Sequence, residues 1–399
     1  MMNEEEMNKE VEKKVKQLLK KCLDAFQNEQ YELVIEHGQA VIELAPTLQK
    51  IHLYVGFAYA YLGKYPASIK HYQKAIELDP DDPMIYLALG NTYSSLEDYE
   101  VASRYYRKSI ELNPEMSETW SCLGHIARKE EKKQDAIRYF KKAVELDPTN
   151  VPLLNNLGLI YAELENYEDA MLCFQKARKR APENISTLQF LGKTYFLLKN
   201  YEEAIRCYKK ALYIDPKNSI TYFELGMLYS EIKRFDEAIS ASQKALDIDP
   251  NFIRALFNTG TFYINLEKYH EAIPYFKKII DIDPNDVSAY CNLGYAYFYL
   301  SDYDQTISCC TKAIELDPKL PMAYSNLGSA YYALKDYKKA IQCLKAVIEL
   351  KEDTTAYYNL GEVYGKTGNE EEEINCYRKA AQLGNEEARK WMFEHNQTW

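Results

Sequence analysis

The sequence has few of the residues that break helices. Glycine and proline number 15 and 14 in 399 residues, about 7% together against about 12% in average usage. This scarcity excludes collagen-like and other glycine-rich or proline-rich classes and favours helices. Because 47% of the residues are hydrophobic and 27% are charged, the chain can bury a large core, which excludes a wholly disordered class.

The chain also lacks an excess of positive charge. Its 49 lysines and arginines face 60 aspartates and glutamates, which gives a formal net charge of −11. Binding to nucleic acid or to an anionic membrane surface relies on a basic surface, so we expect neither. Basic or neutral partners are easier for such a chain to accommodate.

No long apolar run and no cysteine motif stands out. The N-terminal sequence MMNEEEMNKEVEKKVKQLLKKC lacks the apolar stretch of a signal peptide or membrane span, so we expect a cytoplasmic protein without membrane insertion. The nine cysteines form no CxxC pair and no His/Cys cluster. We therefore expect reduced thiols, and no bound metal or cofactor.

A fixed period of 34 residues organises the chain, as two series of residues show. The prolines of the first series are Pro46, Pro80, Pro114, Pro148, Pro182, Pro216, Pro250, Pro284 and Pro318. The glycines of the second are Gly56, Gly90, Gly124, Gly158, Gly192, Gly226, Gly260, Gly294 and Gly328. The next glycine, Gly361, comes one residue early, so the last repeat follows a shortened turn.

This period predicts eleven repeat units that cover nearly the whole chain. Their ranges are 15–48, 49–82, 83–116, 117–150, 151–184, 185–218, 219–252, 253–286, 287–320, 321–353 and 354–387. Residues 1–14 form a charged N-terminal extension that either extends the first helix or frays, and we expect it to fray. Residues 388–399 form the C-terminal part of a capping helix that starts after Asn385, which can cap it.

Each unit is expected to contain two helices. In the range 287–320, Tyr290, Leu293 and Tyr297 keep helical spacing, and an Asp-Pro pair ends the second helix. Large aromatic residues face small ones, so that antiparallel helices can pack with few voids. An Asp, Asn or Ser before each first helix is expected to cap it.

The pattern resembles the tetratricopeptide repeat family. The residues in the family's signature positions are Trp120, Leu123, Gly124, Ala136, Phe140, Ala143 and Pro148. The resemblance implies an all-α fold, a right-handed superhelical solenoid of about eleven helix-turn-helix units. It also implies a concave groove lined mainly by the first helix of each unit.

One asparagine recurs just before the glycine of several first helices. These residues are Asn156, Asn258, Asn292, Asn326 and Asn359. A carboxamide can both donate to and accept from a peptide backbone. The row resembles the asparagines that hold extended polypeptide in the repeat domain of O-linked N-acetylglucosamine transferases, although the catalytic domain of those enzymes is absent. The alternative is that asparagine is common in this position as part of the scaffold.

Apolar residues are expected to face the groove around that row. They are Phe223, Met227, Phe257, Ile264, Tyr295, Phe298, Tyr332 and Tyr358. An exposed stripe of this kind commonly marks an interaction surface. Together with the asparagines, they predict a partner-binding site in the C-terminal half. A clamp for a terminal carboxylate is less well supported, because Asn91, His125, Arg128 and Lys193 supply only fragments of one.

Nothing in the sequence predicts catalysis. The six histidines form no HxxxH or HxxEH pair, and we expect them to lie apart in different units. No phosphate-binding loop and no nucleophile motif occurs. We therefore expect no enzyme, but an adaptor or scaffold that binds an extended or helical segment of another protein. The alternative is a self-associating structural protein, such as a homodimer, in which a second copy or the chain's own terminal helix fills the groove.

Overall fold

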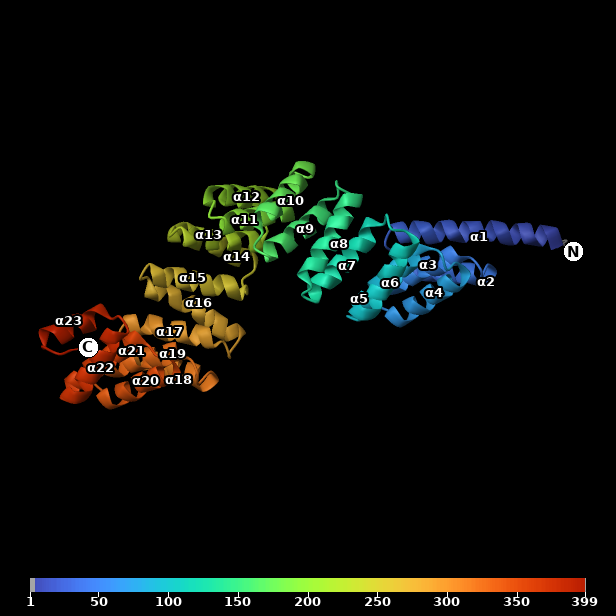
Figure 1. Cartoon of the computed structure of the whole chain (residues 1–399). Helices are drawn as coiled ribbons and strands as arrows, with labels where there is room; N and C mark the ends of the chain where they lie inside the picture. The colour runs from blue at the N-terminus through green and yellow to red at the C-terminus, as the bar shows by residue number, and fades with distance from the viewer. Residues whose placement is uncertain (1–3, 399) are drawn as a thin grey trace. The chain divides into compact units, whose positions relative to one another are not determined.

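The computed structural model describes residues 4–398, which form helices and turns and contain no strand. The chain divides into two compact parts, Met1–Leu198 and Lys199–Trp399, which we call the N-terminal part and the C-terminal part and describe separately. Figure 1 shows that each part consists of helices joined by short connections. The expected all-α class is confirmed, whereas the right-handed superhelix stays a prediction.

Within residues 4–198, eleven helices form the N-terminal part: α1 (Glu4–Gln27), α2 (Tyr31–Leu44), α3 (Gln49–Tyr61), α4 (Tyr65–Leu78), α5 (Pro83–Ser95), α6 (Tyr99–Leu112), α7 (Ser117–Lys129), α8 (Lys133–Leu146), α9 (Val151–Glu163), α10 (Tyr167–Arg180) and α11 (Ile185–Leu197). The described residues of the C-terminal part, 199–398, contain twelve: α12 (Tyr201–Ile214), α13 (Ser219–Glu231), α14 (Phe235–Ile248), α15 (Ile253–Asn265), α16 (Tyr269–Ile282), α17 (Val287–Tyr299), α18 (Tyr303–Leu316), α19 (Pro321–Ala333), α20 (Tyr337–Leu350), α21 (Thr354–Thr367), α22 (Glu370–Gln382) and α23 (Glu386–Glu394).

Every range expected for a repeat, from 49–82 to 354–387, contains two of these helices. Within each part a helix packs on the next one along the chain, as α5 does on α6 and α6 on α7. The first helices of neighbouring repeats also touch, as α3 does with α5 and α17 with α19. The first helices therefore lie beside one another and form a common face in each part.

The N-terminal extension does not fray as expected, because α1 begins at Glu4 and continues without a break to Gln27. Lysine and glutamate favour helix nearly as well as alanine, so a charged segment can extend a helix that is anchored further on. The anchor is the apolar face with buried Cys22 and Ala25, which packs with α2. The first three residues of the extension lie outside the described residues.

The periodic prolines end the second helices by a local mechanism. At the end of α4, Asp79 donates its backbone N–H to the carbonyl of Ala75 and already has extended dihedral angles (φ −148°, ψ 93°). The residue before a proline is driven out of the helical region, so Pro80 stops the helix at this point. The expectation of an Asp-Pro pair is confirmed for α4, α8, α12, α14, α16 and α18. It is wrong for α2, α6 and α10, where Ala45, Asn113 and Ala181 precede the proline, and for α20 and α22, which no proline follows.

Capping of the first helices is less regular than expected. Asp82 accepts the backbone N–H of Met84 at 2.9 Å, and Asn150 accepts that of Leu153 at 3.2 Å. The residues before α7 and α15 are Met116 and Phe252, which make no side-chain cap. The prediction of a cap before each first helix is therefore wrong for these repeats.

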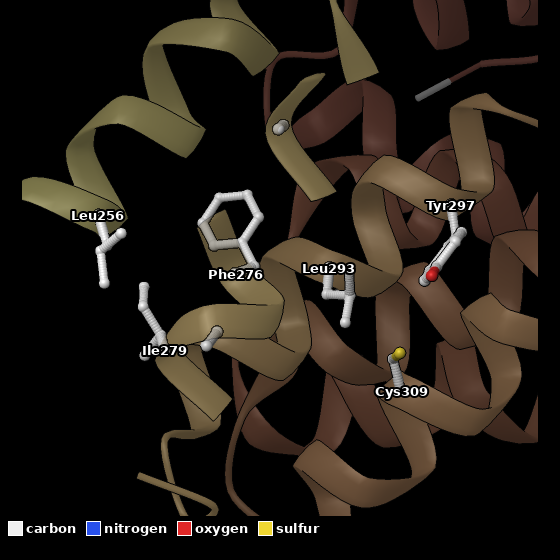
Figure 2. Close-up of a cluster of buried hydrophobic side chains, with 8 residues drawn as sticks. Leu256, Phe276, Ile279, Leu293, Tyr297 and Cys309 are labelled. Carbon is white, nitrogen blue, oxygen red and sulfur yellow. The ribbon is translucent and has the colours of Figure 1, made fainter. Parts of the chain in front are cut away.

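In several repeats the aromatic residue meets the glycine as the sequence suggested, whereas Gly226 and Gly294 face Ser242 and Cys310 instead. A Cβ atom on Gly260 would lie 2.7 Å from the ring of Phe276, and one on Gly124 would lie 2.8 Å from Phe140. Phe276 is completely buried in a cluster shared by four helices, with Leu256 from α15, Leu293 from α17 and Cys309 from α18 (Figure 2). One core thus joins consecutive repeats.

At the C-terminal end, α23 packs on α22. Asn385 caps α23 by accepting the N–H of Ala388 at 2.6 Å. Ala388 and Met392 are fully buried, and the ring of Trp391 lies 4.3 Å from that of Tyr377. The short helix therefore covers the last repeat.

Candidate functional site

The first-helix face of the C-terminal part contains a cavity of about 190 Å³, which we call the C-terminal pocket. It lies between α17, α19 and α21, with α20 behind it. Its lining residues are Phe298, Gly328, Ser329, Tyr332, Ala333, Leu344, Asn359, Glu362 and Val363. Phe298, Tyr332 and Asn359 are three of the residues that the sequence pointed to, and the structure brings them together around one cavity.

The polar side chains on the α21 side of the C-terminal pocket are Asn359 and Glu362, which lie one helical turn apart. Burial raises the pKa of the Glu362 carboxyl, and Lys366 on the same helix opposes this effect. In the described part of the chain, Glu362 has no ion pair within 4.0 Å and no hydrogen bond. A half-buried carboxylate without a partner is costly, because it loses hydration and gains little in return.

Two tyrosines near this carboxylate have raised pKa values. Burial raises the pKa of Tyr332 and Tyr358, and the negative charge of Glu362 raises both further. Tyr332 also contacts Tyr337, and Tyr358 contacts Tyr377, with ring centroids 5.9 and 5.5 Å apart. The sequence pattern on this face singles out aromatic and amide side chains, so it does not point to Glu362.

A group of aromatic rings lies one repeat before the C-terminal pocket. Tyr269 stacks on Tyr299 with centroids 4.8 Å apart, and Tyr295 lies 4.8 Å from Tyr299. Phe298 meets Tyr299 edge to face at 5.4 Å. Tyr299 is half exposed, so this group continues the apolar first-helix face beyond the pocket.

Four asparagines of the predicted row make polar contacts within the chain through their amide nitrogens. Nδ2 of Asn292 donates to the carbonyl of Ser288 at 2.9 Å, and Nδ2 of Asn326 donates to that of Cys291 at 3.4 Å. Asn258 approaches the sulfur of Met227 at 2.7 Å, and Asn156 approaches His125 at 3.1 Å. Within residues 9–398 none of these contacts joins one asparagine to another, so the row is a series of separate side chains.

Phe223 does not face an open groove, contrary to expectation. Its side chain is only 3% exposed and packs with Ala245 and Ala255. The Arg254 guanidinium lies 4.6 Å from its ring and covers it. Phe223 thus fills the junction between neighbouring repeats and belongs to the core.

Two other predicted groove residues are partly accessible. Met227 is 38% exposed. Phe257 is half-buried, and it meets Phe276 edge to face with centroids 5.9 Å apart. Ile264 packs in part against the same core.

The N-terminal part has a comparable cavity, of about 230 Å³, which we call the N-terminal pocket. Phe57, Tyr61 and Tyr65 line its apolar side, and Asn91 and Ser95 line its polar side. Asn91 stands at the repeat position that Glu362 holds in the C-terminal pocket. A first-helix pocket is therefore not confined to the C-terminal half, where the sequence had placed the site.

Larger clefts lie between successive second helices, for which the sequence predicts no site. One of about 820 Å³ is lined by Arg107, Trp120, Arg138 and Lys141 among others. Another, of about 430 Å³ in the C-terminal part, contains Tyr213, which is 87% exposed. We call these the second-helix clefts.

The fragments of a carboxylate clamp are occupied by other contacts. Arg128 forms an ion pair with Glu163, and its Nε donates to Glu163 at 2.8 Å. Asn91 accepts a hydrogen bond from the Tyr106 hydroxyl at 2.8 Å. Arg128 and the amide oxygen of Asn91 therefore already have partners within the chain.

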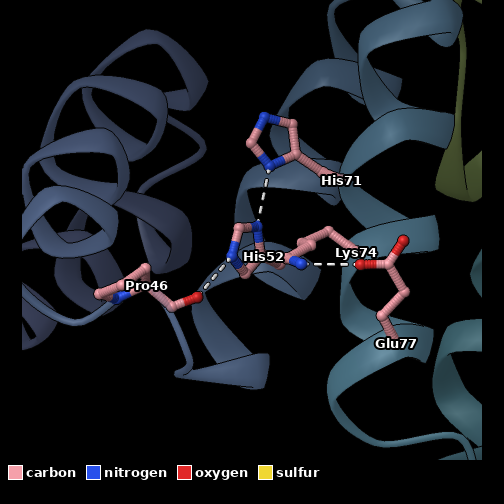
Figure 3. Close-up of polar contacts among 5 residues, drawn as sticks. All are labelled: Pro46, His52, His71, Lys74 and Glu77. Carbon is pink, nitrogen blue, oxygen red and sulfur yellow. Dashed lines mark hydrogen bonds and ion pairs between the residues drawn. The ribbon is translucent and has the colours of Figure 1, made fainter.

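The expectation that the histidines lie apart is wrong for one pair in the N-terminal part. Nδ1 of His52 lies 3.3 Å from Nδ1 of His71, and its Nε2 lies 3.3 Å from the carbonyl of Pro46 (Figure 3). Because that carbonyl can only accept, Nε2 of His52 carries the proton and His71 donates to the other nitrogen. Burial, with the nearby charges of His52 and Lys70, lowers the pKa of His71 to about 4.

The cysteines behave as small core residues. All nine are free thiols, and every one except the half-buried Cys122 is buried. Burial raises the pKa of Cys173 and Cys309 to about 11, which keeps these thiols protonated at neutral pH. Within the part that the structure describes, no group of three or more His, Cys, Asp or Glu side chains could hold a metal ion.

The repeats match models of one family along most of the chain. Models described as TPR repeat or tetratricopeptide repeat match residues 56–97, 260–301 and 328–368, 117–150 and 287–320, 152–217 and 184–251, 85–116 and 354–384, and 241–273 and 309–342. Together these matches cover 56–150 and 152–384. The chain is a tetratricopeptide repeat (TPR) protein.

Solved structures with a similar fold cover this TPR chain to different extents. A crystal structure of MamA is 28% identical, covers 42% of this chain and 92% of its own, and gives a TM-score of 0.38. A crystal structure of YrrB is 26% identical, covers 46% of this chain and 95% of its own, and gives a TM-score of 0.38. A crystal structure of a TPR protein from Parabacteroides merdae is 21% identical, covers 61% of this chain and 97% of its own, and gives a TM-score of 0.48.

No curated protein matches the TPR sequence significantly. Of the described helices, none combines the length and the apolar character needed to cross a membrane.

Proposed function

We propose that this TPR protein is a non-enzymatic scaffold that holds an extended or helical segment of a partner protein on its first-helix face. The observation that carries the proposal is the C-terminal pocket, where Phe298, Tyr332 and Asn359 from three successive first helices surround one cavity. Apolar walls with a few polar groups are typical of binding sites.

The size of the cavity supports a linear partner. A volume of about 190 Å³ lies below the roughly 300–1,000 Å³ of pockets that bind whole small molecules. This is room for one side chain and too little for a folded element. The partner would therefore lie along the face and place single side chains in the pockets, while asparagine carbonyl oxygens such as those of Asn292 and Asn326 accept its backbone N–H groups.

A displayed library of random dodecapeptides, selected on the full-length protein, tests the proposal. We expect peptides that bind the wild type and lose at least about tenfold in affinity on Ala333→Trp, because the new indole fills the C-terminal pocket. Ala333 is exposed, so this variant should fold. Tyr332→Ala, which empties the pocket instead, should weaken the same peptides.

The matched control is Tyr213→Ala, in a second-helix cleft. It should bind the selected peptides as the wild type does. A library that yields no peptide, or peptides that respond to Tyr213→Ala and not to Ala333→Trp, would refute the proposed function.

A further inference from the structure

We infer that the C-terminal pocket takes a lysine or arginine side chain of the bound segment. This inference rests on the proposed function and adds the chemistry of the partner. Its starting point is Glu362, a half-buried carboxylate that lines the pocket.

The first argument is the state of that carboxylate. Glu362 makes no hydrogen bond and no ion pair within the described residues, although its helix places Lys366 four residues further on. An ionised carboxylate can only accept hydrogen bonds. A donor with positive charge is the group that would best offset its lost hydration.

The second argument is the rest of the lining. Phe298 and Tyr332 come from α17 and α19 and border the same cavity as Glu362. Aromatic faces attract a cation within about 6 Å of the ring, and they also cover the aliphatic stem of a lysine or arginine. The amide of Asn359 adds an oxygen that can accept from the same cationic group.

The third argument is the contrast with the N-terminal pocket. That pocket also has aromatic walls, including Phe57 and Tyr61, but the polar side chains that line it, such as Asn91 and Ser95, are uncharged. Asn91 already accepts a hydrogen bond from Tyr106. The two pockets therefore differ in charge, and only the C-terminal one should select a basic side chain. The net charge of −11 favours the approach of a basic segment.

The test uses peptides selected from the dodecapeptide library on three full-length proteins: the wild type, Glu362→Gln and Glu349→Gln. Glu362→Gln keeps the shape of the side chain and removes its charge. Glu349→Gln removes the same charge from an exposed site on α20, outside the pocket.

We expect lysine or arginine to be enriched at one peptide position on the wild type and on Glu349→Gln, and not on Glu362→Gln. A synthetic wild-type peptide should lose at least about tenfold in affinity on Glu362→Gln, and a similar amount when its basic residue becomes norleucine. Its affinity for Glu349→Gln should stay within about twofold.

The two proposals fail in different ways. Peptides that require the pocket but show no basic enrichment, or the same enrichment on Glu362→Gln, overturn the inference and leave the scaffold function in place. Binding only through the general negative charge would appear as an equal loss on both glutamine variants, and it too overturns the inference. A library without any binder overturns both proposals.

Discussion

At the scale of single residues, the burial of His71 beside His52 makes stability depend on pH. His71 has a pKa of about 4 in the folded chain, because burial disfavours its charged form, against about 6.5 in an unfolded chain. Above pH 6.5 both states are neutral, so stability is unaffected. As pH falls from 6.5 towards 4, the unfolded state binds the proton first and the free energy of unfolding decreases.

The variant His71→Gln should remove this dependence. Between pH 7.5 and 4.5 we expect the free energy of unfolding to fall by about 1–2 kcal/mol more in the wild type than in the variant. This value is smaller than the full difference in pKa implies, because His71 is partly exposed. Hydrogen exchange of α3 and α4 at several pH values measures the difference. Parallel losses in the two proteins would show that the histidine pair is not the cause.

The asparagine row yields a second prediction about single residues. Replacing Asn292 or Asn326 with alanine should weaken a selected peptide by about 1 kcal/mol each and leave folding nearly unchanged, since each removes one neutral acceptor. The control is Asn155→Ala. Asn155 is buried and exchanges hydrogen bonds of 2.9 and 3.1 Å with Thr187, so its loss should destabilise the N-terminal part.

Calorimetric titration with the peptide, combined with thermal melts, separates these effects. If Asn292→Ala and Asn326→Ala melt early and bind normally, the row belongs to the scaffold, as the alternative interpretation of the sequence holds.

Residue types alone could not show which of these side chains are accessible. Phe223 and Phe257 stand at the same repeat position, yet Phe223 is buried beneath Arg254, while Phe257 is half-buried. The difference depends on neighbours in adjacent repeats. The same holds for His52 and His71, which are far from any histidine motif and meet only when α3 packs on α4.

At the scale of helices, the turn inside each repeat stores backbone strain. Glu97 has a φ of 60°, and the next residue, Asp98, donates its backbone N–H to the carbonyl of Tyr93 at 3.0 Å. A helix that ends in this way usually has glycine at the position with positive φ. Glycine takes this place in two repeats, at Gly63 and Gly368. Side chains other than glycine are disfavoured in this region of φ.

Glu97→Gly should therefore stabilise the chain by about 0.5–1 kcal/mol, and Gly63→Ala should destabilise it by about 1 kcal/mol. Urea unfolding of the two variants against the wild type measures both effects. Destabilisation by Glu97→Gly as large as that by Gly63→Ala would contradict the account of the turn.

Close packing of paired helices gives a second prediction at this scale. Gly260→Ala should cost about 1–3 kcal/mol, because the new methyl group would meet the buried ring of Phe276 at 2.7 Å. In Gly328→Ala the nearest atom is the Cβ of Cys343 at 3.3 Å, so the better helix propensity of alanine should nearly balance the contact. Hydrogen exchange of α15 and α19 measures the two effects separately. An equal loss of protection in Gly260→Ala and Gly328→Ala would show that the contact with Phe276 is not the cause.

The helices themselves could be predicted well, because their determinants are local and repeated 34 residues apart. The proline that follows most second helices and the glycine that faces an aromatic ring in several repeats act within one repeat, and both recur in the structure. The left-handed turn could not be predicted, since Glu97, Ser301 and Lys335 share no side-chain property that favours it. The length of α1 was also missed, because charged residues do not show where a helix starts.

At the scale of the whole molecule, an accessible first-helix face is the property that separates the scaffold from a self-associating protein. In each part that face keeps a pocket, and α23 packs on α22 at the end of the last repeat. We therefore expect a monomer by light scattering at micromolar concentration. A tight dimer that dissociates when selected peptide is added would favour a second copy as the occupant of the face.

The place of binding is the central claim, and site-specific photocrosslinking tests it most directly. A benzoylphenylalanine at position 332, on the first-helix face, and one at position 213, in a second-helix cleft, would each be irradiated with a selected peptide. We predict a crosslinked peptide from position 332 and none from position 213. Crosslinking from position 213 alone would move the binding site to the second helices and contradict the account.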